Sequence, residues 1–301
     1  MVVQTVLVNV LLALIGVVGV SASGPLMAGA NAPALTIAFW RNAMATALVV
    51  PVAAAARTEE VRALTYRDVR AIVFAGVMLA GHFATWVTSL KMTSVASATA
   101  LVCLQVGWIV LFEHLRGTPA ERSVILGLVL AFGGVLIVSG IDLSLSVRAL
   151  AGDLLALVGG AFAALYTMTG AAVRRHVSTI TYTSGCYFVC AAVLLVLAIA
   201  SGQQLTGFGA RTWVAFAAVM IAAQMFGHSL FNHLLAVMSP TVVSLIILLE
   251  VPGAALLAGV FLDQTPGVGV YAGLALILAG LAVVVSRRPP ASGEAPVGPA
   301  D

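Results

Sequence analysis

The segment LLALIG at residues 11–16 recurs almost unchanged as LLALVG at residues 154–159. Farther along each half, Gly81-His82 recurs as Gly227-His228, although histidine occurs only five times in the chain. The offset between the copies is 143 residues in the first case and 146 in the second, which is nearly constant. A further set of residues repeats at the offset of 146: Met92, Gly107, Gly127, Leu128, Leu130 and Gly134 with Met238, Gly253, Gly273, Leu274, Leu276 and Gly280. We therefore predict two homologous halves.

The composition places both halves in a lipid bilayer. Hydrophobic residues make up 61% of the 301 positions and charged residues 8%, with a mean hydropathy of +1.12. A soluble domain contains about 25% charged residues, so the soluble classes are excluded. One membrane-spanning helix needs about 20 mostly apolar residues. Such runs lie at residues 5–27, 35–56, 69–90, 94–112, 124–139, 154–170, 182–200, 213–237, 242–262 and 267–286.

These runs predict an all-α integral membrane protein with ten transmembrane helices, five in each half. An odd number of helices forces the second half to lie upside down relative to the first. The predicted domains are two inverted five-helix repeats, residues 1–140 and 150–286, followed by a disordered cytoplasmic tail at residues 287–301. Inverted repeats are typical of alternating-access transporters, whose substrate site lies near the membrane midplane between the repeats.

Basic residues predict the orientation. With a cytoplasmic N-terminus, the 14 Lys and Arg residues divide into 10 on the inside, 3 on the outside and Arg41 within the membrane. Cytoplasmic loops carry the excess of Lys and Arg, so both termini are expected in the cytoplasm. The N-terminus lacks the basic region of a cleavable signal peptide, and the first run is expected to remain as a helix. The predicted location is the plasma membrane, with multiple passes.

Several other function classes are disfavoured by what the sequence lacks. The basic residues are scattered and form no patch for nucleic acid. There is no Walker loop, no HExxH or spaced His/Cys metal set, and no GxSxG motif. Cys103, Cys186 and Cys190 lie inside apolar runs and are interpreted as small packing residues. We expect no enzyme, no cofactor and no metal.

Short motifs add a family resemblance over essentially the whole chain. They are Trp40-Arg41-Asn42, Gly152-Asp153-Leu154-Leu155-Ala156-Leu157, the glycine-rich helices at 127–134 and 273–280, and Glu250-Val251-Pro252. With the two five-helix halves, these motifs resemble the EamA-type branch of the drug/metabolite transporter superfamily. The resemblance implies a secondary transporter. Val251 stands between Glu250 and Pro252 where the family commonly has Glu directly before Pro.

Glu250 lies near the middle of the run at 242–262, where an acidic side chain costs several kcal/mol unless it is paired, protonated or hydrated. One interpretation is a substrate contact or proton site. The other is a structural hydrogen bond, to which a carbonyl freed by Pro252 could contribute.

Polar side chains recur every four residues on two other helices, so each set shares a helix face. These residues are Gln224, His228 and Asn232 in one half, and His82 and Trp86 in the other. Facing lipid would be costly for them, so both sets are expected to point into the bundle. Two readings stay open: they line a central cavity, or they are packing contacts duplicated with the repeat.

Gln105 and Tyr166 are further candidates to line the cavity, whereas Trp40 and Trp213 fit an interfacial belt. Arg41 either holds an anionic group or reaches the lipid headgroups. The candidate substrate-binding residues are Arg41, His82, Trp86, Gln105, Tyr166, Gln224, His228, Asn232 and Glu250.

The predicted function is secondary transport of a small metabolite, an amino acid or similar polar or amphipathic solute, with export as the expected direction. A carboxyl group in a low-dielectric site can exchange protons near neutral pH, so Glu250 is a candidate for proton coupling. Uncoupled exchange or facilitated diffusion fits the sequence equally well. The alternatives are a receptor or assembly subunit that does not transport, or a channel on the same fold. The expected partners are the solute, the bilayer and protons.

Overall fold

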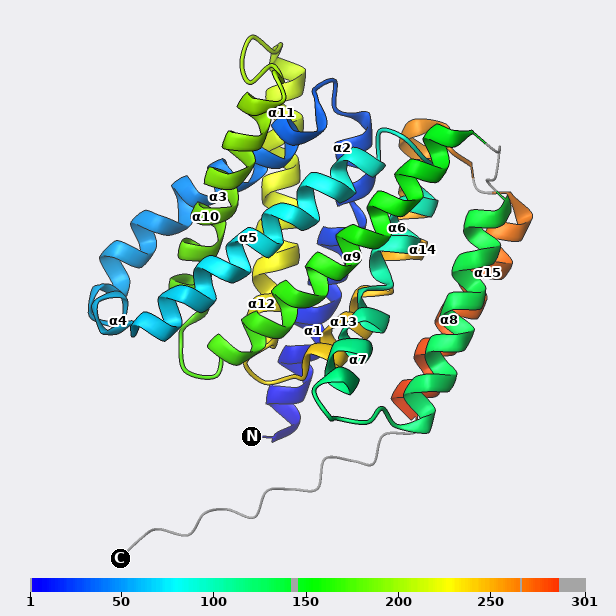
Figure 1. Cartoon of the computed structure of the whole chain (residues 1–301), viewed down its shortest axis with the longest axis horizontal. Coiled ribbons are helices and arrows are strands. Elements are labelled where there is room, and N and C mark those ends of the chain that lie inside the picture. The colour runs from blue at the N-terminus through cyan, green and yellow to red at the C-terminus, as the bar shows by residue number, and fades with distance from the viewer. Residues whose placement is uncertain (1, 142–145, 266, 287–301) are drawn as a thin grey trace, which may run out of the picture.

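The computed structural model describes residues 2–141, 146–265 and 267–286, and within these ranges all regular secondary structure is helical (Figure 1). The tail predicted at residues 287–301 lies outside the described residues. The helices are α1 (Val2–Ser21), α2 (Ser23–Gly29), α3 (Ala34–Ala56), α4 (Thr58–Ala63), α5 (Tyr66–Ser89), α6 (Val95–Cys103), α7 (Gln105–Leu115), α8 (Arg122–Ile141), α9 (Val147–Val173), α10 (Thr179–Ala200), α11 (Ala210–Val219), the π-helix η1 (Met220–Ser229), α12 (Leu230–Leu234), α13 (Pro240–Ile247), α14 (Glu250–Leu262) and α15 (Val268–Ser286).

Eight helical segments among the described residues are long and apolar enough to cross a membrane. Four of them join consecutive elements: α1 with α2, α6 with α7, α11 with η1 and α12, and α13 with α14. Helices α8 and α15 contain the shorter apolar stretches Arg122–Gly134 and Val268–Gly280. The prediction of an all-helical membrane protein is confirmed for the described residues, with eight helical segments able to span a membrane. The count of ten spans stays a prediction.

Serine residues fix where several helices begin. The hydroxyl oxygens of Ser94, Ser146, Ser178 and Ser239 each accept a hydrogen bond from the backbone N–H three residues later, which satisfies a donor that the first turn leaves free. Ser146 explains a difference from the sequence prediction. The sixth helix, expected at 154–170, begins at Val147, because the cap starts it before the apolar run.

The packing of the helices repeats between the two halves (Figure 1). In one contact, α5 (third predicted helix) packs against α9 (sixth predicted helix). The equivalent contact joins η1 (eighth predicted helix) to α1 (first predicted helix). Helix α3 packs against its equivalent α10, and α8 packs against its equivalent α15. The two interrupted segments cross over: α6 packs against α14, and α7 packs against α13. This pattern is what two structurally equivalent halves produce when a twofold axis exchanges them.

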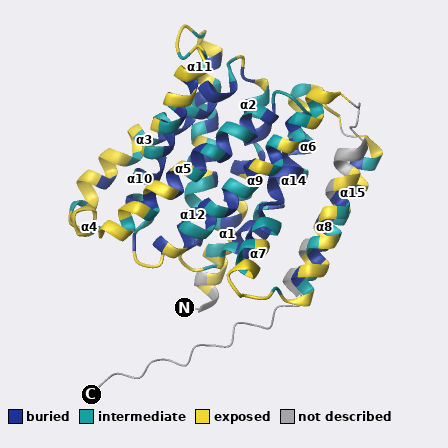
Figure 2. Ribbon diagram, in the orientation of Figure 1, coloured by how far each residue is buried: buried dark blue, intermediate teal, exposed yellow. Residues whose placement is uncertain are grey.

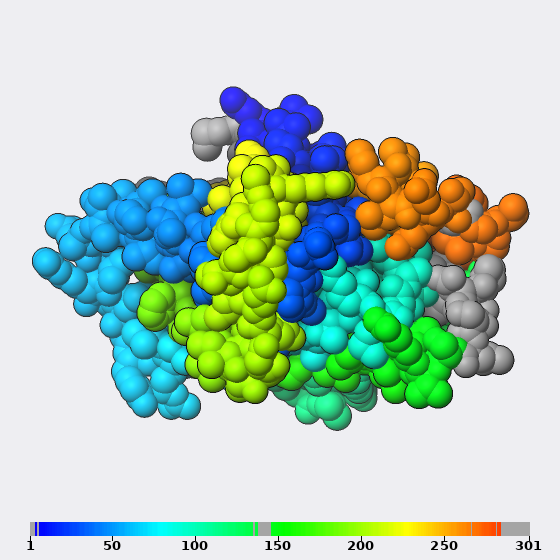
Figure 3. Space-filling view, turned by 90° about the horizontal axis from the view of Figure 1, so that it is seen from above, coloured from blue at the N-terminus to red at the C-terminus, as the bar shows by residue number. Residues whose placement is uncertain are grey.

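Alternate loops meet at each end of the bundle. At one end, the Gln203 side chain accepts a hydrogen bond from the Leu35 N–H at 3.0 Å, and Trp40 Nε1 donates to the Leu205 carbonyl at 2.8 Å. Seen from above, the yellow-green segment near residue 205 lies beside blue residues of the α2–α3 region (Figure 3). At the same end, Lys91 Nζ donates to the carbonyls of Ala28 and Ala30, and burial lowers the pKa of this ammonium group.

At the opposite end, α4 and the start of α5 contact the loop between α9 and α10. The Glu60 carboxylate accepts hydrogen bonds from the hydroxyls of Ser178 and Thr181. Burial alone would raise the pKa of Glu60, yet these hydrogen bonds hold it below the usual value. Asp68 pairs with His176 at 2.8 Å. The loops that follow α2, α5 and α10 therefore lie at one end of the bundle, and those that follow α3 and α9 lie at the opposite end.

Burial is concentrated along the centre of the bundle (Figure 2). The outer faces expose large apolar side chains, including Val18 and Leu136, each 71% exposed. Water would penalise such faces, whereas hydrocarbon accepts them. The polar residues to be explained are therefore those at the centre.

Candidate functional site

Two interrupted helices meet at the centre of the bundle. The α6–α7 segment breaks at Leu104, and the α13–α14 segment breaks at residues 248–249. The breaks touch, because Cys103 Sγ lies 3.9 Å from the Ile247 carbonyl and 3.9 Å from Glu250 Oε2. Non-helical backbone inside a membrane is tolerated where it is buried in protein or lines a cavity. Here a cavity of about 50 Å³ adjoins both breaks.

Residues at equivalent positions of the two halves line this cavity. Val20 and Ser23 from the first helical segment are matched, at the offset of 143 residues, by Ala163 and Tyr166 from the sixth. His82 and Trp86 of α5 are matched, at the offset of 146, by His228 and Asn232 of the eighth segment. Because both members of each pair face the same space, the cavity lies between the halves.

Seven of the nine residues predicted from sequence line the cavity: His82, Trp86, Gln105, Tyr166, His228, Asn232 and Glu250. The histidine rings approach each other with centroids 6.2 Å apart. His82 Nδ1 lies 3.1 Å from the Gly159 carbonyl, which anchors α5 to α9.

Tyr166 and Asn232 form a closed pair across the cavity. The phenol hydroxyl donates to Asn232 Oδ1 at 2.9 Å, and the amide nitrogen donates to that hydroxyl at 2.6 Å. Each polar group satisfies the other, as buried polar groups require. This pair therefore joins α9 to α12. Because its polar groups bond to each other, a ligand would form hydrogen bonds with other residues of the cavity wall.

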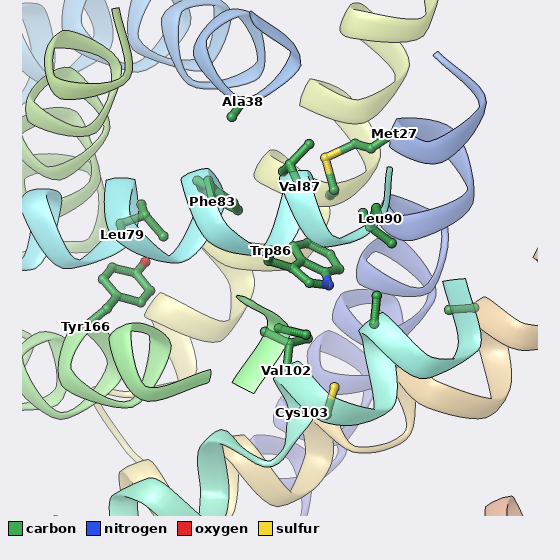
Figure 4. Close-up of a cluster of buried hydrophobic side chains, with 14 of the residues drawn as sticks. Met27, Ala38, Leu79, Phe83, Trp86, Val87, Leu90, Val102, Cys103 and Tyr166 are labelled. Atoms are coloured by element: carbon green, nitrogen blue, oxygen red, sulfur yellow. The ribbon is translucent and has the colours of Figure 1, made fainter. Parts of the chain in front are cut away.

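Two buried polar atoms on the cavity wall have no hydrogen-bond partner among the described residues: Trp86 Nε1 and Glu250 Oε1. The Trp86 ring projects from α5 toward Val102 and Cys103 on α6 (Figure 4). An unsatisfied buried donor or acceptor costs about 1–3 kcal/mol. One donor and one acceptor in the same cavity can be satisfied by a polar solute or by water.

Arg41 and Gln224 lie beside the cavity, outside its lining. Both are fully buried, and Arg41 Nε donates to Gln224 Oε1 at 2.9 Å. Gln224 in turn donates to Asn42 Oδ1 at 3.1 Å. The interpretation in which Arg41 reaches the headgroups is wrong, because its side chain ends inside the bundle.

The expectation that Gln224, His228 and Asn232 share one face holds only for the last two. Gln224 turns toward α3, whereas His228 and Asn232 face the cavity. The reason is that Met220–Ser229 winds as a π-helix, and the i→i+5 hydrogen bonding of a π-helix changes which residues align. π-Helical turns within α-helices are frequent at functional sites.

The sequence prediction omitted Ser23, Cys103, Thr167 and Asn42, although three of them line the cavity and Asn42 holds Gln224. A signal existed for Ser23, which stands at the repeat position of Tyr166. Cys103, interpreted as a packing residue, contacts Glu250. In the described part of the chain, no three His, Cys, Asp or Glu side chains are grouped to hold a metal ion.

Comparisons with known proteins agree with the two-half organisation. The model of the EamA-like transporter family matches residues 7–140 and again residues 150–286. A solved structure described only as a crystal structure of a protein has a TM-score of 0.71 and 19% sequence identity, covering 92% of this chain and 96% of that one. This likeness concerns the fold. No curated protein matches the chain.

Proposed function

The chain belongs to the EamA-like transporter family, and we propose that it moves a small polar or amphipathic metabolite, such as an amino acid, across the cytoplasmic membrane by alternating access. The observation that carries this proposal is the cavity between the halves, lined by His82 with His228 and by Trp86 with Asn232. Substrate sites at the interface of repeats are typical of secondary transporters. The remaining wall is largely apolar, as in most small-molecule sites.

The size of the cavity supports a transport cycle with more than one conformation. Its volume of about 50 Å³ is below the roughly 300–1,000 Å³ of ordinary ligand pockets. Hydrogen bonds join loops at both ends of the bundle. A solute therefore requires the halves to move apart. Ten spans in inverted five-helix repeats, residues 1–140 and 150–286, allow the same motion to open either end.

We also propose that Glu250 couples transport to protons. Glu250 is buried, its Oε1 is unpartnered, and it stands at the start of α14 beside the break. A carboxyl group at such a place can take up a proton when the cavity opens to one side and release it on the other.

Solute flux into proteoliposomes tests the proposal. The purified protein is reconstituted and offered a defined mixture of common amino acids and organic acids, with uptake read by mass spectrometry. We expect saturable uptake of a subset and acceleration by unlabelled solute preloaded inside. Flux that rises linearly without counterflow would indicate a channel. Absence of flux from a folded preparation would favour a receptor or assembly subunit.

The orientation gives a separate prediction. Single cysteines at Arg57 and Arg175 should be protected from an impermeant thiol reagent in intact cells, whereas one at Arg148 should be labelled. All three positions are exposed, and the basic asymmetry of 10 to 3 predicts a cytoplasmic location for the first two. The native cysteines Cys103, Cys186 and Cys190 are buried, so the wild type serves as the unlabelled control. The reverse labelling pattern would invert the topology.

A further inference from the structure

Arg41 is a buried cation surrounded by neutral partners. Its Nε donates to Gln224, its Nη1 lies 3.4 Å from Ser23 Oγ, and its guanidinium lies over the Phe83 ring, 4.1 Å from the centroid. Its Nη2 has no hydrogen-bond partner in the described part of the chain. Guanidinium groups remain charged in proteins, so the side chain brings a full positive charge into the bundle.

Among the described residues, no carboxylate oxygen lies within 4.0 Å of the Arg41 guanidinium. The ion pair between His176 and Asp68 lies elsewhere, at one end of the bundle. A buried charge without a counter-charge is strongly unfavourable. Ser23, which contacts Arg41, lines the same cavity as Glu250, a carboxyl group with one free oxygen. Arg41 is therefore compensated only when Glu250 is ionised or when another anion enters.

The cavity offers a route for such an anion. Ser23 belongs both to the cavity wall and to the neighbours of Arg41. Phe83, under the guanidinium, packs edge-on against His228 with ring centroids 5.3 Å apart. Ser23 and Phe83 thus each link the guanidinium to the lining of the cavity. A carboxylate at Ser23 would be close enough to bind the free Nη2 donor after a small shift.

We propose that the transported solute carries a carboxylate, that this carboxylate binds to Arg41, and that Glu250 competes with it for the same cation. This inference rests on the proposed transport function and names the solute class of that site. Either of two anions, the Glu250 carboxylate or the solute carboxylate, can neutralise the charge of Arg41. When Glu250 is protonated, Arg41 can bind the solute carboxylate. When Glu250 is ionised, it neutralises Arg41 and weakens the binding of the solute.

The other titratable groups around Arg41 and Glu250 do not replace either anion. They are Cys103 on α6, His82 on α5, Tyr166 on α9, Tyr187 and Cys190 on α10, and His228 on η1. Thiol and phenol groups ionise well above neutral pH, and histidine carries either a positive charge or none. Proton and carboxylate therefore bind together, and the affinity for carboxylates falls as pH rises through the titration of Glu250.

Matched solutes test the assignment in proteoliposomes. The probe is a defined mixture of common amino acids and organic acids, together with their carboxamides and the corresponding decarboxylated amines. At low solute concentration the wild type should take up carboxylates at least about 30-fold faster than the matched amides, since losing the partner of a buried charge costs about 2 kcal/mol or more of binding. Arg41→Gln should lose this preference. Arg211→Gln, at an exposed arginine, is the control and should retain it.

Glu250→Gln provides a second readout that keeps Arg41 intact. In this variant, uptake of carboxylates by counterflow should become independent of pH, because the competing anion is gone. Equal uptake rates for carboxylates and amides in the wild type would overturn the assignment, as would an Arg41→Gln variant that keeps the preference. If Arg41→Gln does not fold, a pH dependence in Glu250→Gln equal to the wild type overturns it. No accumulation of any solute by the wild type would count against the transport function itself.

Discussion

Replacing Glu250 by glutamine should abolish solute accumulation driven by a pH gradient while leaving counterflow intact. Gln keeps the shape of the side chain and can still accept from Cys103, which now contacts Glu250 Oε2 at 3.9 Å, but it cannot carry a proton. For one coupled proton, each pH unit should support about tenfold accumulation in the wild type, which is about 1.4 kcal/mol. In the variant this ratio should fall to about one. Proteoliposomes with an imposed gradient, and then with equal pH and preloaded solute, give the two measurements.

Two further variants show that the effect belongs to this carboxyl group. Glu59→Gln makes the same chemical change on the exposed surface of α4 and should transport like the wild type. Glu250→Ala removes shape as well as charge and should melt at a lower temperature than Glu250→Gln, because it also leaves a cavity. Undiminished gradient-driven accumulation by folded Glu250→Gln would remove this residue from the coupling mechanism.

The sequence predicted the arrangement of the helices better than it predicted their breaks. Hydrophobic runs and the Gly-His repeat were sufficient to expect two similar halves, because lipid forces helices and the repeat forces equivalent packing. The break at Leu104 has no local signal, since no proline stands there. The helices on either side of it, α6 and α7, pack against α14 and α13, contacts that only the folded chain brings together.

Some cavity residues could likewise be predicted from the sequence, and others could not. His82, His228 and Glu250 could be found from sequence because ionisable groups inside apolar runs stand out. Ser23 and Cys103 are small residues that are common as packing groups in membrane helices, so their place on the wall follows from tertiary geometry. The contact between Gln224 and Arg41 depends on the π-helix, and the i, i+4 spacing read from the sequence pointed Gln224 to the wrong face.

The repeat has a consequence for stability, because α8 and α15 approach each other at two equivalent glycines. A Cβ atom on Gly134 would lie 2.5 Å from the Gly273 carbonyl oxygen, and one on Gly280 would lie 2.5 Å from the Gly127 carbonyl oxygen. Gly134→Ala and Gly280→Ala must therefore push backbone against backbone. Each should destabilise the protein by about 1–3 kcal/mol and lower the melting temperature of the purified protein in detergent.

The neighbouring glycine supplies a control of the same chemistry. A Cβ atom on Gly133 would meet only the Leu276 Cδ2 atom, at 3.3 Å, and this end of a flexible side chain can move. Because alanine favours the helix over glycine by about 1 kcal/mol, Gly133→Ala should be neutral or slightly stabilising. The double variant Gly134→Ala, Gly280→Ala should lose less stability than the sum of the two single losses. The first added methyl group already separates the two helices, so the second causes less strain. Unequal effects of Gly134→Ala and Gly280→Ala, or a Gly133→Ala variant as damaging as either, would show that the two halves do not pack as equivalents at this pair.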